Sequence, residues 1–189
     1  MASFHTKTFT KHDDYMTPKY AWENIKEFLK EEYKTIYEPF YGDGSSGEIL
    51  KEIFSDRTII HNEVDFYEYS TIYEYDAIIS NPPFSDAKKI MPKLLEVDKP
   101  FILLMPSSKI NTSYFRAWRD KNIQIIIPRK RIHFRKFVEG EEVESKGANF
   151  DCFYYCYKMD LPNDITWLDD EPKKTIKKKK LIKKKKSTK

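Results

Sequence analysis

Glycine is concentrated in one short turn of this chain, between an expected strand and an expected helix. Residues 42–47 read GDGSSG and hold three of the five glycines in the 189-residue sequence. The apolar run Thr35-Ile36-Tyr37 before them favours a strand, and apolar positions recur after them at helical spacing, at Ile49, Leu50, Ile53 and Phe54. Ser45 and Glu48 have the spacing of a capping box that opens this helix. A strand, a tight glycine turn and a helix predict an α/β unit whose backbone a ligand can approach closely.

The chemical nature of that ligand depends on the residues around the turn. The spacing matches the dinucleotide pattern G-x-G-x-x-G, and Glu63 follows about 20 residues on, just after the apolar run at residues 58–60. Taken alone, this unit could bind NAD. However, Glu38 stands immediately before the turn, where a carboxylate could pair with a ligand's ammonium group and would repel a pyrophosphate. The acid therefore argues against a dinucleotide.

A second motif, Asn81-Pro82-Pro83-Phe84, follows the short apolar run at residues 77–80. Asn81 precedes a proline and must leave the strand extended, and neither proline has a backbone N–H to donate. The Asn81 side-chain oxygen and the Pro82 carbonyl can accept both hydrogens of an exocyclic amino group, while Phe84 stacks on the ring that carries it. Two acceptors beside a stacking ring suit the binding of a flipped-out base. The alternative is an Asn-Pro turn that ends an edge strand, with Phe84 packed into the core.

The other apolar runs extend the α/β pattern along the chain. Strands are expected at residues 101–105, 123–127 and 150–159, and helices at 17–29, 85–97 and 113–120, with a kink or restart at Pro92. Strands alternating with helices, then two strands without a helix between them, predict a mostly parallel sheet ending in an antiparallel hairpin. With 40% apolar content, the length suits one core. Gly42 and Asn81 would lie together beyond the carboxyl ends of the strands.

Taken together, these motifs resemble those of a known enzyme family. The segment Glu38-Pro39-Phe40-Tyr41-Gly42-Asp43-Gly44 resembles the cofactor motif of S-adenosylmethionine-dependent amino-methyltransferases, and residues 81–84 resemble their catalytic motif, in the same order. Asp14-Tyr15-Met16-Thr17-Pro18 resembles the segment before the cofactor motif in many DNA adenine methyltransferases. Over about residues 12 to 160, the chain is most similar to the small DNA N6-adenine methyltransferases of bacteriophages and large DNA viruses.

The resemblance implies a Rossmann-like class I methyltransferase domain at residues 1–168, with S-adenosyl-L-methionine as cofactor and the N6 amino group of adenine in DNA as acceptor. The implied catalytic residues are Asn81, Pro82, Pro83 and Phe84. The implied cofactor-binding residues are Tyr15, Thr17, Pro18, Glu38, Pro39, Phe40, Gly42, Gly44, Glu63, Asp65 and Phe66. Family members place a separate strand and helix between the ribose-binding acid and the next motif, whereas Glu63 and Asp65 are nearly adjacent here. Either acid could therefore hold the ribose, or Asp65 and Phe66 could bracket the adenine.

Similar motifs occur in enzymes that act on other substrates, because the motif identifies a planar amino group and not the molecule that bears it. They serve enzymes that methylate adenine or guanine in RNA and glutamine in protein release factors. RNA is thus an alternative substrate, and a non-catalytic nucleic-acid-binding module is an alternative of another class. The intact residues Gly42, Gly44 and Asn81 argue against the latter.

Two basic segments could bind nucleic acid. The first holds Arg129, Lys130, Arg131, His133, Arg135 and Lys136, interleaved with apolar residues, and could contact phosphates. Alternatively, these side chains pair with the glutamates at 139, 141, 142 and 144. The second segment, residues 173–189, holds 11 lysines and no acid, so the net charge of +4 leaves −7 for residues 1–172. A lysine-rich disordered tail at 169–189 is therefore predicted, as a phosphate tether or a nuclear import signal.

Cysteine and histidine give little sign of a metal site. Cys152 and Cys156 would face the same side of a strand, too far apart to bridge, and no Cys or His cluster lies nearby. We expect small buried hydrophobic side chains there and no metal. Since no apolar run approaches the ~18 residues of a membrane span and no signal peptide is visible, we expect a soluble intracellular protein, nuclear in a eukaryotic host.

Overall fold

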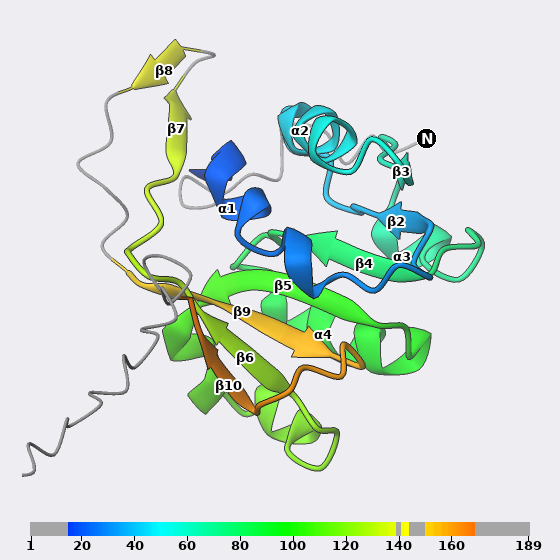
Figure 1. Cartoon of the computed structure of the whole chain (residues 1–189), viewed down its shortest axis with the longest axis vertical. Helices are drawn as coiled ribbons and strands as arrows, with labels where there is room; N and C mark the ends of the chain where they lie inside the picture. The colour runs from blue at the N-terminus through cyan, green and yellow to red at the C-terminus, as the bar shows by residue number, and fades with distance from the viewer. Residues whose placement is uncertain (1–14, 139–140, 144–149, 169–189) are drawn as a thin grey trace, which may run out of the picture.

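The computed structural model describes residues 15–138, 141–143 and 150–168, with the backbone alone for 136–138 and 141–143. Its centre is a seven-stranded sheet with the order β10-β6-β9-β5-β4-β2-β3 (Figure 1). The strands in chain order are β2 (Thr35–Tyr37), β3 (Thr58–Ile60), β4 (Ala77–Ser80), β5 (Phe101–Pro106), β6 (Gln124–Ile127), β9 (Cys152–Tyr157) and β10 (Ile165–Trp167). Strands β3, β2, β4 and β5 are parallel neighbours, and β9 is antiparallel to both β5 and β6. The predicted Rossmann-like α/β class is confirmed.

The far end of the sheet differs from the prediction. The antiparallel pair β6 and β9 does not end the sheet, because β10 adds to β6 in parallel. Only three residues form β10, and two of them, Ile165 and Trp167, are exposed. So short a strand without an apolar run gives almost no sequence signal.

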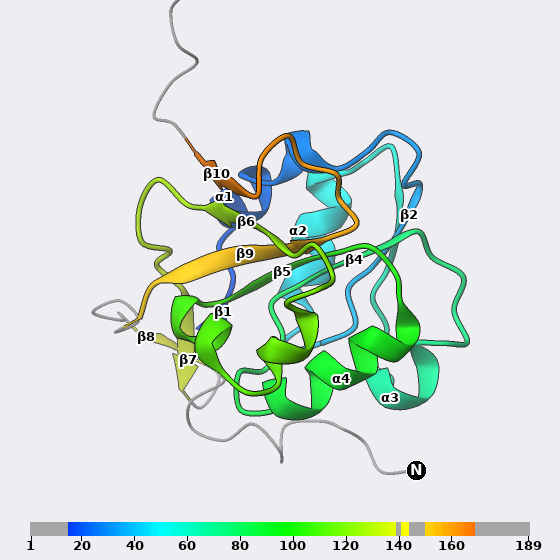
Figure 2. The ribbon, with the colours of Figure 1, turned by 90° about the horizontal axis from the view of Figure 1, so that it is seen from below.

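Helices cover both faces of the sheet. α1 (Lys19–Glu23) and α2 (Ser45–Ile53) lie on one face, and α3 (Phe66–Tyr69) and α4 (Ala87–Val97) lie on the other (Figure 2). Alternate strand residues divide the core between these faces: Ile36 and Ile79 join the cluster of α1 and α2, whereas Tyr37 and Ile78 join the cluster of α3 and α4. The central strands are apolar at nearly every position because both of their faces are buried.

The segment between β5 and β6 is less regular than expected. In place of one helix at residues 113–120 it forms two 3-10 helices, η2 (Ser107–Asn111) and η3 (Phe115–Trp118); a third, η1 (Lys26–Phe28), follows α1. Thr112 separates η2 from η3, because its backbone is extended and its hydroxyl donates to the Lys109 carbonyl at 2.6 Å. By contrast, α4 continues through Pro92 without a restart.

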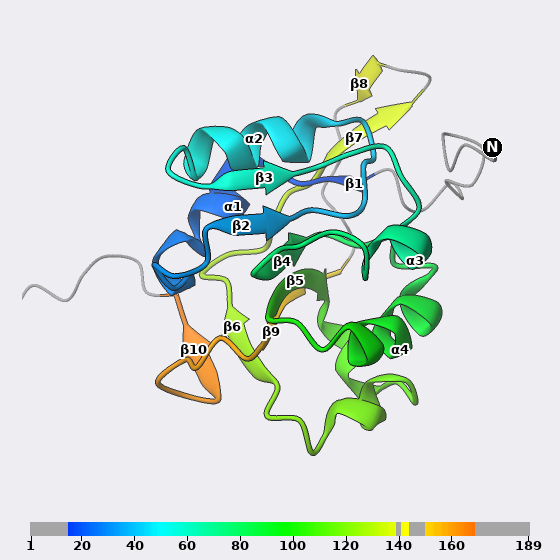
Figure 3. The same ribbon diagram turned by 90° about the vertical axis from the view of Figure 1, so that its right-hand side faces the viewer.

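A small antiparallel sheet stands beside the main one, with the order β1-β7-β8. It consists of β1 (Tyr15–Met16), β7 (Arg135–Val138) and β8 (Glu141–Val143), and it lies on the side toward which β2 and β3 point (Figure 3). Residues 141–143, which follow the basic segment, form a strand that pairs with β7. Residues 139–140 and 144–149 lie outside the described part, as do Asp14 and the expected tail at 169–189.

Cys152 and Cys156 are both buried on the same face of β9, within the cluster of α1 and α2, as expected for small hydrophobic side chains. Within the described residues, no helix combines the length and the apolar character needed to cross a membrane.

Candidate active site

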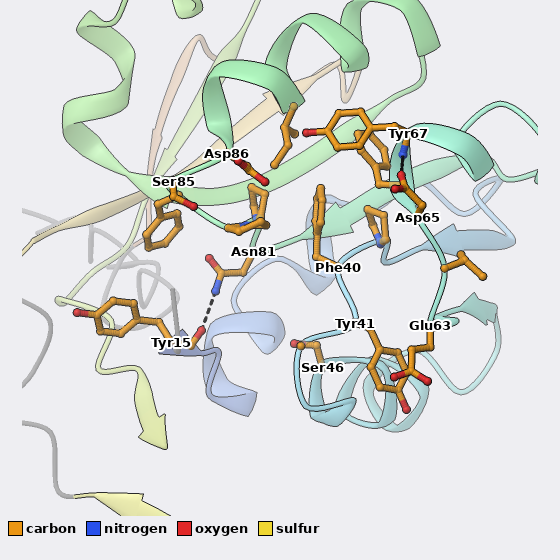
Figure 4. Close-up of a pocket in the computed structure, with 18 of the residues that line it drawn as sticks. Tyr15, Phe40, Tyr41, Ser46, Glu63, Asp65, Tyr67, Asn81, Ser85 and Asp86 are labelled. Carbon is orange, nitrogen blue, oxygen red and sulfur yellow. Dashed lines mark hydrogen bonds between the residues drawn. The ribbon is translucent and has the colours of Figure 1, made fainter. Parts of the chain in front are cut away.

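The two sequence motifs meet at one edge of the sheet, because β2 and β4 are parallel neighbours and each motif follows the carboxyl end of its strand. A cavity opens there (Figure 4). The predicted site residues in its wall are Tyr15, Pro39, Phe40, Gly42, Glu63, Asp65, Phe66, Asn81, Pro82, Pro83 and Phe84. Four others, Thr17, Pro18, Glu38 and Gly44, are not in the wall. Among the described residues, no group of three or more His, Cys, Asp or Glu is arranged to hold a metal ion.

The three positions of the turn require glycine for different structural reasons. Gly42 and Gly44 have φ angles of +59° and +82°, which side-chain-bearing residues rarely adopt, and the Gly44 N–H donates to the Tyr41 carbonyl at 2.8 Å. Gly47 is buried in the first turn of α2, where an added Cβ would lie 2.1 Å from Cδ2 of His61. The first two glycines therefore shape the turn, and the third admits the imidazole of His61.

The predicted capping box at the start of α2 is wrong. Gly44 is the N-cap, and the backbone N–H of Ser45 donates to Oδ1 of Asp43 at 2.9 Å. Glu48 instead pairs with Lys51 on the exposed side of the helix. The left-handed conformation of Gly44 shifts the helix start by one residue, so that Asp43 accepts from the Ser45 N–H, which the predicted capping box assigned to Glu48.

Glu38 is buried beneath the turn and has several partners in the protein. Its Oε1 accepts from the Ser80 hydroxyl and from the Phe40 backbone N–H, and its Oε2 lies 2.6 Å from Nδ1 of His61. Burial is the largest single influence on the pKa of His61 and lowers it, but the bond to the Glu38 carboxylate, the charge of that carboxylate and the bond to the Glu38 carbonyl together outweigh burial and raise the pKa above its ordinary value. These contacts join the ends of β2, β3 and β4 below the cavity. Pairing of Glu38 with a ligand's ammonium group stays a prediction.

Asn81 has one end of its amide occupied and the other open. Nδ2 donates to the Tyr15 carbonyl at 3.0 Å, whereas Oδ1 is buried and has no hydrogen-bond partner among the described residues. A buried acceptor without a partner costs about 1–3 kcal/mol unless a ligand or water satisfies it. The bond to Tyr15 thus orients the amide and leaves its oxygen available at the cavity wall.

Phe84 lies in the cavity wall and also packs against protein. Its ring stacks on Tyr15 at a centroid distance of 6.4 Å and contacts Phe150 edge-on at 5.5 Å and Phe134 at 6.4 Å. Its carbonyl accepts from Nζ of Lys109 in η2 at 3.1 Å. The alternative of an Asn-Pro turn is wrong in its edge strand, because β4 is paired on both sides, by β2 and β5. Its other half is supported in part, because Phe84 is partly buried and packs against the core cluster of α1 and α2.

Glu63 and Asp65 both line the cavity, on the chain between β3 and α3. Asp65 is the N-cap of α3: its Oδ1 accepts from the backbone N–H of Tyr67 at 2.6 Å and of Glu68 at 3.4 Å. Glu63 is exposed. Both acids therefore remain candidates for a ribose hydroxyl.

Several lining residues were not predicted, among them Ser46, Tyr67, Ser85 and Asp86. Ser85 and Asp86 directly follow the second motif, and Tyr67 follows Asp65 and Phe66, so proximity in sequence was the available signal. Burial raises the pKa of Tyr67 to about 12, and the charges of Asp86 and Asp65 act in the same direction.

The basic segment around residues 129–135 leads from β6 to the small sheet. Arg131 forms a two-bond ion pair with Asp151, at 2.8 and 3.3 Å. The side chains of the glutamates at 139, 141, 142 and 144 lie outside the described part of the structure, so the alternative that they pair with this segment stays a prediction. Arg129 and Lys130 are exposed, and half-buried Arg135 donates to the Ser45 hydroxyl at 3.3 Å. Contacts from this segment to phosphates stay a prediction.

No protein-family model matches the chain, and no curated protein sequence matches it. Among solved structures, it is similar to a protein described as a class I S-adenosylmethionine-dependent methyltransferase from Listeria monocytogenes (12% identity, TM-score 0.46, covering 85% of this chain and 67% of the other). It is also similar to a precorrin-6Y C5,15-methyltransferase from Geobacter metallireducens (12% identity, TM-score 0.46, covering 79% of this chain and 97% of the other). A third similar structure is an S-adenosylmethionine-dependent O-methyltransferase from Thermotoga maritima (11% identity, TM-score 0.40, covering 80% of this chain and 66% of the other). All three TM-scores lie below 0.5, so we argue function from this chain's own residues.

Proposed function

We propose that the chain transfers a methyl group from S-adenosyl-L-methionine to the exocyclic N6 amino group of an adenine in DNA. The observation that carries this proposal is the orientation of Asn81. Its Nδ2 is bound to the Tyr15 carbonyl, so the buried Oδ1 without a partner is the end that meets a ligand. An acceptor of this kind, next to the proline carbonyl of residue 82, matches the two hydrogens of an amino group on a planar ring.

The residues around the turn fit the cofactor. Gly42 exposes backbone at the cavity wall, the acids Glu63 and Asp65 can accept from ribose hydroxyls, and Phe40 and Phe66 supply apolar walls. The Tyr67 hydroxyl is a further buried polar atom, with no hydrogen-bond partner among the residues that the structure describes. When bound, S-adenosyl-L-methionine supplies an electrophilic methyl group on a sulfonium.

Asn81 and Pro82 position the amino group by accepting its two hydrogens. Acceptance of both draws the nitrogen away from planarity and makes its lone pair available for in-line attack. The rate enhancement would then come mainly from placement and from electrostatic stabilisation of the charge that develops on that nitrogen. The amino group can lose its proton after transfer, so no general base with a shifted pKa is required. Phe84 offers a face for the base, and its backbone is held by Lys109.

The choice of DNA rests on the likeness of residues 14–18 to DNA adenine methyltransferases and on the basic residues of the segment that leads from β6 to β7. Arg129, Arg131 and Arg135 could contact phosphates there, together with the lysines of 173–189, which lie outside the described residues. This electrostatic contribution should depend steeply on salt.

The test is to incubate the protein with methyl-labelled cofactor and unmethylated DNA, RNA or protein, and to identify the modified group by mass spectrometry. We expect N6-methyladenine in DNA, none with Asn81→Ala, and cofactor binding by that variant close to the wild-type value. Asn163→Ala is the matched control, because Asn163 is exposed and is not in the cavity wall. If label appears only in RNA or only in protein, that molecule and not DNA is the substrate. Near-wild-type activity of Asn81→Ala would show that Asn81 has no catalytic role.

A further inference from the structure

Tyr67 has a hydroxyl group that the protein itself does not satisfy. The residue belongs to α3, and its backbone N–H is bound by Asp65 at 2.6 Å, so the start of its helix is fixed. Its ring packs edge-on against Phe66 at 5.4 Å. The hydroxyl oxygen is buried, has no hydrogen-bond partner among the described residues, and belongs to a side chain in the cavity wall. Figure 4 shows Tyr67 and Asp65 on one side of Phe40, with Asn81 on the other.

This hydroxyl keeps its proton at neutral pH, because burial raises its pKa to about 12, and it therefore has a hydrogen to donate. The nearest charged groups that bear on it are the carboxylates of Asp65 and Asp86. An anionic acceptor such as a phosphate or a second carboxylate would be repelled there. The acceptor must therefore be a neutral atom of a ligand.

The surrounding side chains limit the shape of that ligand. The ring centroids of Phe40 and Phe66 lie 5.1 Å apart, and together with Ile90 these rings give this part of the cavity apolar walls. Apolar walls, one buried neutral donor and nearby carboxylate acceptors match a flat heterocycle that carries ring nitrogens and an amino group.

We infer that the Tyr67 hydroxyl donates a hydrogen bond to a ring nitrogen of the cofactor's adenine, and that Tyr67 thereby determines specificity for this base. The inference rests on the proposed function, since it assigns part of the cavity to S-adenosyl-L-methionine. The target base occupies the other part, at Asn81.

The experiment measures the Kd of S-adenosylhomocysteine and of adenosine by calorimetry, without DNA, for wild type and Tyr67→Phe. Both ligands should bind about 10-fold more weakly to Tyr67→Phe, as expected when one hydrogen bond is lost and the ligand's acceptor is left without a partner. Tyr69→Phe is the matched control: it lies in the same helix, stacks on Tyr73 and is not in the cavity wall. It should leave both Kd values unchanged.

Adenosines that lack a single ring nitrogen (1-deaza, 3-deaza and 7-deaza) identify the bonded atom. One of the three should bind wild type as weakly as adenosine binds Tyr67→Phe, and the variant should lose nothing further with that analogue. The thermal midpoint of the ligand-free variant should not fall, because the change removes a buried hydroxyl that has no partner.

The outcomes separate this inference from the proposed function. If wild type binds S-adenosylhomocysteine and Tyr67→Phe binds it equally well, Tyr67 does not contact the adenine, while the proposed function stands. If the variant changes only the KM for DNA, its hydroxyl faces the target base instead. If wild type binds neither S-adenosylhomocysteine nor S-adenosylmethionine, both are overturned.

Discussion

Replacement of Gly47 by alanine should destabilise the protein, although the position is helical and exposed helices usually gain from this change. An added Cβ would lie 2.1 Å from Cδ2 of His61 and 2.5 Å from its Cγ, too close for any real contact. His61 cannot easily move aside, because its Nδ1 lies 2.6 Å from the carboxylate of Glu38, which is 1% exposed. The clash therefore acts on a buried pair of bonded side chains.

The magnitude follows from two ways of relieving the clash. If His61 stays and the helix shifts, overpacking costs about 1–3 kcal/mol. If His61 leaves, Glu38 loses its buried partner at a cost of about 3–5 kcal/mol. The gain from replacing a helical glycine offsets only about 0.5–1 kcal/mol. Because the cheaper route sets the cost, we expect a net loss of about 0.5–2 kcal/mol, with about 2–4 °C in the thermal midpoint for each kcal/mol in a domain of this size.

The assay is urea unfolding of four proteins: wild type, Gly47→Ala, His61→Ala and the double variant. His61→Ala removes the contacts at 2.1 and 2.5 Å but keeps the Cβ of residue 61, which lies 2.8 Å from the added Cβ, so Gly47→Ala should cost clearly less in the His61→Ala background than in wild type. An equal cost of Gly47→Ala in both backgrounds would show that His61 is not the reason for the glycine, and would refute the reasoning.

Further predictions concern the same site. Since the pKa of His61 is raised in the folded protein, the stability from its bond to Glu38 should be full below about pH 6.5 and lost as the pH rises through the folded value; urea unfolding of wild type against His61→Ala across pH checks this. Phe84→Ala should weaken DNA engagement by about 1–3 kcal/mol, measured as KM, with cofactor Kd unchanged. Lys109→Met should lower kcat/KM for methylation about 10-fold, through loss of a charged bond to the Phe84 carbonyl, whereas Lys88→Met on the exposed side of α4 should not. Deletion of residues 173–189 should flatten the salt dependence of DNA binding; an unchanged slope would exclude the tether.

Local signals predicted the parts of the site that depend on few neighbouring residues. The positive φ angles of Gly42 and Gly44 and the extended exit at Asn81 follow from residue type alone, and parallel strands brought the two turns together. Gly47 matched the third position of a known pattern, but its contact with His61 exists only once α2 packs over the end of β3. No local pattern contains that information.

The features that the sequence did not predict also depend on the folded backbone and on burial. The capping box failed because one left-handed glycine shifted the start of α2 by one residue, a change too small for a spacing rule to detect. Tyr67 carries no distinguishing sequence feature beyond following Asp65 and Phe66, and its importance arises from an unsatisfied hydroxyl that can be recognised only after burial is known. The short strand β10 is added by pairing with β6 and not by its own apolar pattern.

The amide of Asn81 is oriented by a segment far away in sequence. Its hydrogen-bond partner is Tyr15, 66 residues earlier, because the Tyr15 carbonyl accepts the Nδ2 hydrogen and so decides which end of the amide meets the cavity. A carboxylate at position 81 would face that carbonyl with an acceptor and would be repelled. Tyr15 in turn pairs with Lys136 of β7, so the small sheet beside the cavity fixes the strand that orients the amide. A ligand that displaced β7 would therefore disturb the orientation of the Asn81 amide, and with it the binding of the amino group, without contacting Asn81 itself.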